Sequence, residues 1–259
     1  MAQTSSQKIL SDLKKAYESI AKDFSDTRNH HWPEFRFFSE YIPQQSKVLD
    51  LGCGNGRFFG FLEEREILVD YTGIDFCRPL LDIARKKYPQ QEFIEQDITK
   101  LHLGKKFDRI ISVAAFHHIP SRAMRQKTLR LIFDHLEDDG VLLLSVWNLW
   151  QKKYFFAHAR SWARFVFSFF RKDPRDLFIP FGKKKTMRYY HAFLPFELRR
   201  LLRTNGFSVE RTEISRYNYL LVCRKNMLST RGHPLFAAGK ELTPHLGKSS
   251  AATLSKTLS

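Results

Sequence analysis

The sequence has few cysteines and no long apolar run, and both absences exclude whole classes of protein. Its three cysteines, Cys53, Cys77 and Cys223, lie far apart and form no CxxC pair, which excludes the usual zinc-ligand spacing and a disulfide framework. No stretch reaches ~18 uninterrupted apolar residues, the length that a membrane-spanning helix needs. The first ten residues, MAQTSSQKIL, lack the basic and apolar regions of a secretory signal. We therefore expect a cytoplasmic protein with free thiols.

Acidic residues are scarce relative to basic ones. The chain of 259 residues has 27 Asp and Glu against 43 Lys and Arg, so its net charge is +16. Residues 151–191 contain 11 of the basic residues and only two acids, and aromatic side chains lie between these cations. Such a segment indicates contact with a polyanion such as nucleic acid. Two alternatives are an amphipathic helix on an anionic membrane and a helix whose aromatics pack on the domain.

Apolar periodicity alternates between helix and strand along most of the chain. Two helices are expected before the first strand, at 8–24 and 33–41. Five apolar runs then predict strands with helices between them: strands 47–52, 70–75, 92–97, 107–116 and 140–148, and helices 57–64, 79–88 and 121–136. A helix after Pro195 is followed by two β-rich runs, 207–215 and 218–225, that can pair as a hairpin. This alternation predicts an α/β fold with a parallel sheet covered on both faces.

A glycine-rich stretch, VLDLGCGNGRF, lies between the first expected strand and the helix that follows it. Glycines in this position let the backbone turn sharply and approach a ligand without interference from a Cβ atom. A second strand ends in Asp75, about twenty residues later, where an acid can hold a ribose diol. A third strand ends in Asp97 and the apolar Ile98, which together suit an adenine. The pattern predicts a nucleoside-containing cofactor.

The DLGCGNG form resembles the first motif of S-adenosylmethionine-dependent methyltransferases, and the terminal hairpin resembles the antiparallel edge of their sheet. The resemblance implies a doubly wound, Rossmann-like fold with a seven-stranded sheet, and S-adenosylmethionine as the cofactor. It assigns cofactor binding to the glycine loop and to two strand ends: Asp50, Gly52, Gly54, Gly56, Asp75 and Asp97. By this assignment the loop shapes the methionine pocket, Asp75 holds the ribose hydroxyls and Asp97 meets the adenine amine.

The methyl acceptor must be inferred from segments expected beyond the carboxyl ends of the strands, where such sheets bind ligands. These segments are AAFHHIP, VWNLW, MRYYHAF and FSDTRNHHWP, and the last belongs to N-terminal helices that would cover the pocket as a lid. They contain no acidic general base, which a neutral N–H or O–H acceptor usually needs. A carboxylate acceptor needs no base, because it is already anionic. It needs an arginine to orient it, and Arg28 and Arg188 can do so.

Six stretches in order resemble the tRNA wobble-uridine carboxyl methyltransferases: YESIAKDFSDTRNHHWP, VLDLGCGNGRF, ISVAAFHHI, VWNLWQ, RYYHAFLPFEL and NYLLVCRK. That family converts 5-carboxymethyluridine at the wobble position of tRNA into its methyl ester, so the resemblance implies tRNA as the substrate. The candidate catalytic residues are Arg28, His117, His118, Arg188, Tyr189 and His191. The candidate substrate-binding residues are Trp32, Trp147, Tyr190, Lys183, Lys184 and Lys185.

The resemblance also bears on partners and on domain organisation. Eukaryotic members of the family work with a small zinc-binding activator subunit, which the edge strand EFIEQD could receive by strand addition. We expect residues 1–45 to form an N-terminal helical lid and residues 46–225 to form the methyltransferase domain, with 151–191 as a basic insertion. Residues 226–259 have few large apolar side chains and are expected to be a disordered tail.

Several alternatives stay open from the sequence. A uridine 5-oxyacetic acid would offer the same carboxylate as 5-carboxymethyluridine. A methyltransferase of a small-molecule or lipid acceptor would place the basic insertion on an anionic membrane, and a non-catalytic RNA-binding subunit would keep the fold alone. No metal site is expected, because His117 and His118 are predicted on a strand, where adjacent side chains point to opposite faces.

Overall fold

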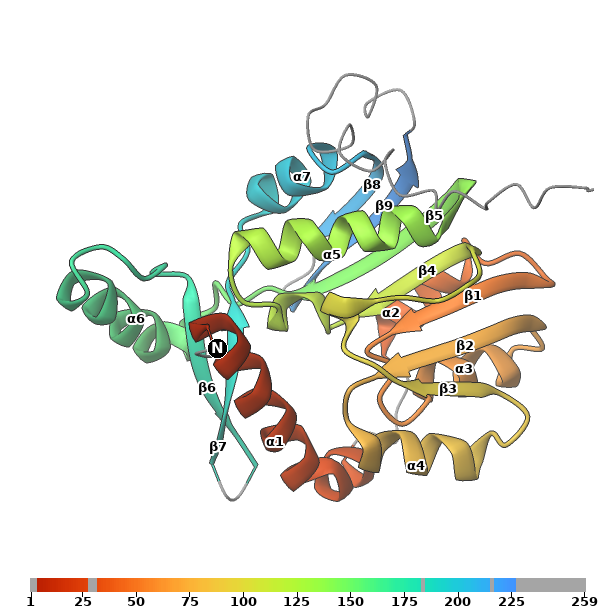
Figure 1. Cartoon of the computed structure of the whole chain (residues 1–259), viewed down its shortest axis with the longest axis horizontal. Coiled ribbons are helices and arrows are strands. Elements are labelled where there is room, and N and C mark those ends of the chain that lie inside the picture. Colours follow the sequence, from red (N-terminus) through yellow and green to blue (C-terminus); the bar gives the residue numbers. More distant parts are fainter. Residues whose placement is uncertain (1–3, 28–31, 183–184, 215–216, 227–259) are drawn as a thin grey trace, which may run out of the picture.

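The computed structural model describes residues 4–27, 32–182, 185–214 and 217–226. Its centre is a seven-stranded sheet in the order β3-β2-β1-β4-β5-β9-β8, in which β9 runs antiparallel to both of its neighbours (Figure 1). The strands are β1 (Ser46–Leu51), β2 (Val69–Asp75), β3 (Glu92–Glu95), β4 (Phe107–Val113), β5 (Leu136–Trp147), β8 (Phe207–Ile214) and β9 (Asn218–Lys225). The predicted Rossmann-like sheet with its terminal hairpin is therefore confirmed.

Helices cover both faces of this sheet, and each face has its own apolar core. The helices are α1 (Ser5–Asp26), α2 (Pro33–Ser39), α3 (Arg57–Glu64), α4 (Arg78–Lys87), α5 (Arg122–His135), α6 (Phe155–Phe167) and α7 (Pro195–Arg203). Side chains of α5 and α7 pack with Leu49 and Leu51 on one face, and side chains of α2, α3 and α4 pack with Val48 on the other. Successive residues of β1 thus alternate between the two cores, as the period of a strand requires.

Sequence signals explain where several helices begin. The Thr4 side chain accepts a hydrogen bond from the Gln7 N–H, and the Gln7 side chain accepts one from the Thr4 N–H, which is a capping box at the start of α1. The helices α2, α4 and α7 have a proline in their first two positions, where no intrahelical N–H bond is lost. The Ser121 side chain caps α5 by accepting from the Met124 N–H.

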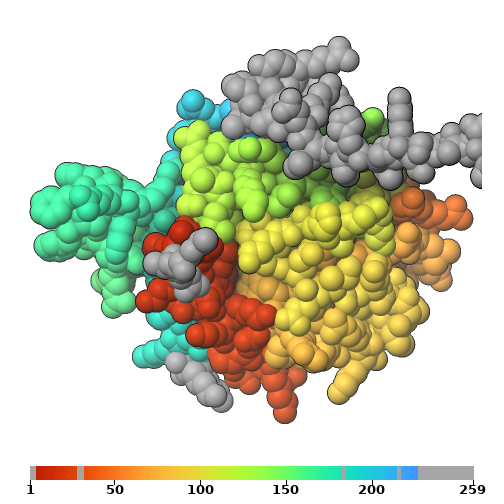
Figure 2. Space-filling model, in the orientation of Figure 1, coloured from red at the N-terminus to blue at the C-terminus, as the bar shows by residue number. Residues whose placement is uncertain are grey.

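The basic insertion folds as α6 followed by a separate antiparallel hairpin of β6 (Asp176–Phe181) and β7 (Thr186–His191). This hairpin was not predicted from the sequence. Helix α1 packs against β7 on one side and α4 on the other, so it bridges the insertion and the main domain (Figure 1). Figure 2 shows that the residues of α6 project from the body of the molecule.

The predicted end of the fourth strand is wrong, and β3 ends and β5 begins earlier than predicted, at Glu95 and Leu136. Strand β4 ends at Val113, and Ala114 has a φ of 55°, a left-handed conformation that is incompatible with a continuing strand. The two histidines lie beyond it in a short 3₁₀ turn, Phe116–His118, with their ring centroids 4.5 Å apart. They therefore do not point to opposite faces of a strand.

The structure does not test the predicted tail or the predicted domain boundaries. The predicted disordered tail lies outside the described residues, apart from Asn226, and the predicted domain boundaries stay predictions. Within the described ranges, no helix is long and apolar enough to span a bilayer.

Candidate functional site

A cleft lies at the carboxyl ends of β1, β2 and β4, with α1 as its roof. Its floor is the glycine turn after β1, and its roof presents Leu10, Leu13, Tyr17 and Phe24. Polar contacts fasten this roof to the domain: the Asn55 amide donates to the Ser25 hydroxyl over 2.8 Å, and Lys14 pairs with Glu95 at 2.8 Å. The N-terminal helix therefore closes over the strand ends.

The glycine turn has backbone conformations and close contacts that exclude other side chains. Gly52, Gly54 and Gly56 have φ values of 80°, 56° and 77°, in the left-handed region that favours glycine. A Cβ atom at Gly52 would lie 2.4 Å from the Cβ of Ala115. Gly52 and Gly54 line the cleft, whereas Gly56 is the N-cap residue before α3 and packs beneath the Tyr88 ring. The structure thus brings two of the three predicted glycines to the site.

The three predicted acids all line the cleft, and the two at the ends of β1 and β2 are deeply buried. The Asp75 carboxylate accepts hydrogen bonds from the Cys77 N–H over 2.8 Å and the Gly54 N–H over 3.0 Å, so it fixes the turn against β2. Burial raises its pKa to about 6. Burial likewise raises the pKa of Asp50, which accepts from the Tyr71 hydroxyl, to about 7. Asp97 caps the following 3₁₀ turn by accepting from the Thr99 N–H.

A chain of hydrogen bonds crosses the far wall of the cleft from Arg188 to the backbone of Tyr189. The His118 Nδ1 lies 2.6 Å from the Tyr189 carbonyl oxygen, an acceptor only, so this nitrogen carries the proton. Its Nε2 therefore accepts from the Tyr17 hydroxyl over 2.8 Å, and that hydroxyl accepts from Arg188 Nη1 over 3.1 Å. Burial lowers the pKa of His118 to about 3, which keeps the imidazole neutral.

The guanidinium of Arg188 lines the cleft with only 2% of the residue exposed. Aromatic rings surround it, with the Phe181 centroid at 4.1 Å and those of Tyr190 and Tyr17 at 5.3 and 5.4 Å. No carboxylate among the described residues pairs with it, and its Nε has no hydrogen-bond partner there. Burying a cation without a counter-ion is costly. The site is therefore suited to an anion supplied by a ligand.

Two other predicted residues, His117 and Tyr190, belong to a stack of rings behind the cleft wall that Arg188 and His118 form. His117 does not line the cleft; its Nδ1 accepts from the Trp147 N–H over 3.1 Å, and burial lowers its pKa. Its ring stacks on Tyr190 at 5.2 Å, and Tyr190 stacks on Trp147 at the same centroid distance. Of these three residues, Trp147 alone lines the cleft, so the other two support it.

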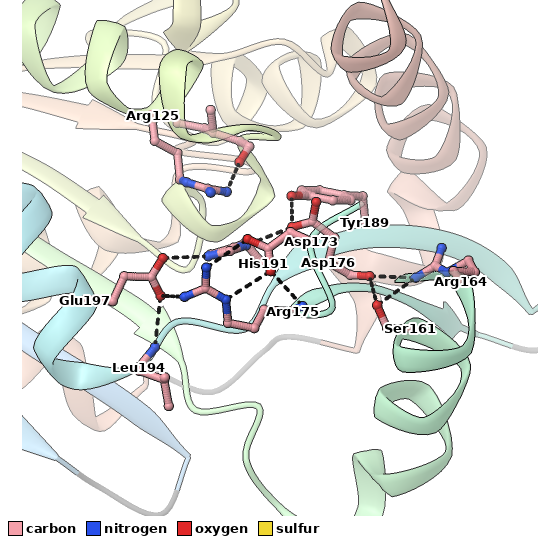
Figure 3. Close-up of polar contacts among 11 residues, drawn as sticks. Arg125, Ser161, Arg164, Asp173, Arg175, Asp176, Tyr189, His191, Leu194 and Glu197 are labelled. Carbon is pink, nitrogen blue, oxygen red and sulfur yellow. Dashed lines mark hydrogen bonds and ion pairs between the residues drawn. The ribbon is translucent and has the colours of Figure 1, made fainter. Parts of the chain in front are cut away.

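Tyr189 and His191 belong to a polar network outside the cleft, shown in Figure 3. The Tyr189 hydroxyl donates to Asp176 over 2.7 Å, and the His191 ring lies between Asp176 at 2.8 Å and Glu197 at 3.1 Å. Arg175 completes this network, which we call the hairpin clamp, by pairing with Asp173 and Glu197. Because Glu197 belongs to α7, the clamp fixes the β6–β7 hairpin to the main domain.

The hairpin clamp also brings carboxylate and imidazole atoms of Asp173, Asp176 and His191 within 4.8 Å of one another. Such a spacing could hold a cation. The same groups are already bound by Arg175, Tyr189 and Glu197, so the arrangement is an ion-pair network (Figure 3).

Of the remaining predicted residues, one lines the cleft, one is exposed elsewhere, and three lie outside the described residues. Trp32 lines the cleft, with the Arg57 guanidinium 4.5 Å from its ring centroid. Lys185 is exposed in the turn between β6 and β7. Arg28, Lys183 and Lys184 lie outside the described residues.

Tyr17, which connects Arg188 to His118, was not predicted from the sequence as a site residue. Its position in the apolar pattern of the first helix indicated packing alone. Its hydroxyl was the available signal, because a tyrosine buried at such a position usually finds a polar partner.

Comparisons with known proteins agree with this geometry. Residues 29–212 match a family described as a methyltransferase domain. The chain is 31% identical over 195 residues to a protein of Encephalitozoon cuniculi named as a methyltransferase, covering 74% of this chain and 85% of that protein. It is 28% identical over 234 residues to the tRNA (carboxymethyluridine(34)-5-O)-methyltransferase of Schizosaccharomyces pombe, covering 82% of this chain and 95% of that protein.

Solved structures show the same fold. One is the 1,6-didemethyltoxoflavin-N1-methyltransferase of Burkholderia thailandensis with bound S-adenosylhomocysteine, at a TM-score of 0.63 and 18% identity, covering 87% of this chain and 92% of that one. Another is a Haloferax volcanii methyltransferase in complex with the Trm112 activator. Its TM-score is 0.62 at 16% identity, and the match covers 83% of this chain and 97% of that one. The resemblance seen in the sequence is confirmed by these relatives, and the chain belongs to the methyltransferase domain family.

Proposed function

We propose that this protein transfers a methyl group from S-adenosylmethionine to the carboxylate of a 5-carboxymethyl-type uridine at the wobble position of tRNA, which gives the methyl ester. The observation that carries the proposal is the buried guanidinium of Arg188, which faces the cleft without a carboxylate partner among the described residues. An acceptor carboxylate is the group that this cation lacks.

The cleft fits S-adenosylmethionine in its shape and its polar groups. Gly54 has almost no neighbouring atom where a Cβ would project, so its bare backbone leaves room for a ligand over the turn. Asp75 suits the ribose hydroxyls, and Asp97 with Ile98 suits the adenine. The bound cofactor would supply an electrophilic methyl group on a sulfonium. Asp50 and the turn itself are assigned to the methionine part.

The acceptor side needs orientation and no proton transfer. A carboxylate is already a nucleophile at neutral pH, and an arginine holds it through charge-assisted, parallel hydrogen bonds. The hydroxyl of Tyr17 and the neutral imidazole of His118 fix the guanidinium in place. His118 therefore acts as a positioning residue. Arg28, in the segment that follows α1, is proposed as a second contact to the same carboxylate.

The uridine must leave the anticodon stack to reach this cleft, and such bases commonly stack on aromatic side chains. Trp147 and Trp32 line the cleft and are proposed for this contact. Phe181, the last residue of β6, contacts both Phe24 of α1 and the Arg188 guanidinium, so this end of the hairpin lies beside the cleft. Lys183, Lys184 and Lys185 come after it in the sequence, separated from it by Gly182, and are proposed to bind tRNA phosphates.

An activator subunit is proposed as a partner. The Haloferax volcanii methyltransferase, which shares this fold, was solved in complex with such an activator. Strand β3 forms one edge of the sheet here and pairs only with β2 among the described strands. An added strand could pair with that edge. A zinc ion in the activator and a cytoplasmic location for the complex stay predictions, and both fit a tRNA substrate.

A small-molecule or lipid acceptor is less supported than tRNA. The relative from Schizosaccharomyces pombe matches this chain over 95% of its own length and is named for the tRNA reaction. A 5-oxyacetic acid uridine would present the same carboxylate to Arg188, so nucleoside analysis must separate it from 5-carboxymethyluridine.

The test uses the purified protein, S-adenosylmethionine labelled in its methyl group, and bulk tRNA that lacks the wobble ester. The label is expected in one modified uridine and is expected to be released by mild alkali, because the product is an ester. An activator subunit is added in a parallel reaction. Label that survives alkali would mean an N-methyl, C-methyl or ether product and would overturn the proposal.

A further inference from the structure

Exposed large apolar side chains gather on the outer face of α6 and in the turn after it. Thirteen large apolar side chains are exposed in the described ranges, and eight of them lie between residues 150 and 170. We define the α6 patch as the seven that are not hydrogen-bonded: Phe155, Phe156, Trp162, Val166, Phe167, Phe169 and Phe170. Contiguous exposed patches of this kind indicate an interaction site.

Helix α6 shows the reverse of the usual arrangement of a surface helix. Its inward face carries Ser161, which is 1% exposed and donates to the Asp176 carbonyl, and Arg164, which donates to the same oxygen (Figure 3). Its outward face carries Phe156 and Phe167, which are 77% and 85% exposed. A helix that packed its aromatics on the domain would place them inside. The alternative in which these aromatics pack on the domain is therefore wrong for the α6 patch.

The turn after α6 adds two more exposed rings in a disfavoured backbone conformation. Phe169 and Phe170 have φ values of 51° and 65°, in the left-handed region that bulky residues rarely adopt. They are nevertheless 84% and 67% exposed, so domain burial does not compensate for that conformation. The turn holds both rings on the outside of the molecule.

The charged residues of α6 and of the turn after it, up to Lys172, are all positive, and the next residue, Asp173, pairs with Arg175 in the hairpin clamp. Between residues 150 and 172 the chain has six Lys and Arg and no acid. Arg164 faces inward, and the other five are exposed: Lys152, Lys153, Arg160, Arg171 and Lys172. None of these five takes part in an ion pair with another residue that the structure describes. An apolar stripe with a cationic border is complementary to a layer of anionic headgroups over acyl chains.

From this arrangement we propose that the α6 patch binds an anionic membrane surface. The aromatic side chains insert at the level of the headgroups, and the surrounding cations contact lipid phosphates and carboxylates. The projection of α6 from the body leaves the helix free to lie on a flat surface (Figure 2). RNA backbone contact would call for cations on the outward face itself, which phenyl rings occupy here. The membrane acts as a location for the enzyme, and the methyl acceptor stays in the cleft.

The test is flotation of the full-length protein with vesicles of phosphatidylcholine alone or mixed with phosphatidylserine. The change is the triple variant Phe156→Ser, Phe167→Ser and Phe169→Ser. The matched control is Leu68→Ser with Phe196→Ser, two side chains that are each 69% exposed elsewhere on the surface. The wild type and the control are expected to float with anionic vesicles, and the triple variant is expected to lose this binding by roughly tenfold or more.

Circular dichroism and a melting curve check that the triple variant is folded. The methylation assay in vesicle-free solution is expected to give wild-type rates for it, so failure here is distinguishable from failure of the proposed reaction. Equal flotation of wild type and triple variant would overturn the membrane proposal. Absence of wild-type flotation would also overturn it. This holds even if the triple variant loses tRNA affinity or self-association, because such a loss would assign the patch to RNA or to a second copy of the chain.

Discussion

At the scale of single residues, Arg188 combines burial, positive charge and a position in the cleft wall. Replacing it by lysine keeps the charge but removes the planar pair of donors that grips a carboxylate. We expect Arg188→Lys to lower kcat/KM by about 100-fold and to change cofactor affinity by no more than about threefold. Single-turnover methylation and titration with S-adenosylhomocysteine measure the two quantities.

Tyr17→Phe is the matched control for this change, because it keeps the ring and removes only the hydroxyl that Arg188 and His118 share. Its expected loss is smaller, about tenfold, since the guanidinium remains but is less well fixed. A loss of cofactor affinity as large as the loss of methyl transfer in Arg188→Lys would contradict the role of Arg188 in acceptor binding.

Asp50 gives a second prediction at this scale, one that depends on pH. Burial raises its pKa to about 7, whereas an unfolded chain has the ordinary value near 3.9. The native state therefore binds more protons than the unfolded state in this window, and the Asp50 contribution to stability falls as pH rises from about 4 to about 7.

Asp50→Asn removes that titration and keeps an oxygen that can accept from Tyr71. Its free energy of unfolding, relative to wild type, is expected to rise between pH 4 and pH 7 and to level off above, as the pKa shift requires. Urea unfolding across this range measures the difference. A difference that stays constant with pH would show that the native carboxyl has an ordinary pKa.

At the scale of elements, the hairpin clamp decides where β7 and its Arg188 lie. Glu197 holds both Arg175 and His191 from α7. Glu197→Gln weakens these partly exposed pairs, and we expect a loss of about 1–2 kcal/mol in the free energy of unfolding. Faster hydrogen exchange in β7 and a lower kcat should accompany it, because the guanidinium loses its support.

The same variant also tests the predicted catalytic role of Tyr189 and His191, which the structure places in the clamp. Lys105→Ala, which removes an exposed pair with Glu92, is the control for a general loss of stability. If kcat falls in Glu197→Gln while hydrogen exchange in β7 and stability are unchanged, the clamp has a chemical role and not only a structural one.

The main sheet could be predicted from the sequence because buried parallel strands are continuous apolar runs, such as Val48–Leu51, and because turns and caps between them carry their own signals. The β6–β7 hairpin could not, since its strands contain Pro180 and Arg188 and it packs against α1 and pairs with Glu197 of α7, which are contacts between distant parts of the sequence. The end of β4 was also beyond the sequence, because Ala114 takes a left-handed conformation that its residue type disfavours.

The candidate site divides in the same way. The acids and glycines of the cofactor cleft were predictable, because the glycines form the turn after β1 and the acids lie at the carboxyl ends of successive parallel strands, or just beyond them. Tyr17 and the different surroundings of neighbouring residues in RYYH were not, because they depend on how the insertion packs against α1. Arg188 faces the cleft, whereas Tyr189 faces the clamp.

At the scale of the whole molecule, the positive charge of the insertion is divided between its two ends. One end is the cationic border of the α6 patch. The other is the lysine run 183–185, which follows in the sequence after Phe181, a residue that lies beside the cleft. A membrane and a tRNA could therefore contact the protein at the same time. Flotation of tRNA with anionic vesicles only when the protein is present would demonstrate both contacts.

The lysine run supplies the last prediction. Replacing Lys183, Lys184 and Lys185 by serine should raise the KM for tRNA by about tenfold and reduce its salt dependence, because fewer phosphate counter-ions are released on binding. The value of kcat should change little, since the cleft is untouched. The control is a second triple variant with the same change in net charge. It replaces three exposed lysines of α4 and α5 by serine: Lys86, Lys87 and Lys127. An equal rise in KM for both triple variants would mean that net charge alone attracts tRNA, and an unchanged KM would exclude the hairpin turn from the tRNA interface.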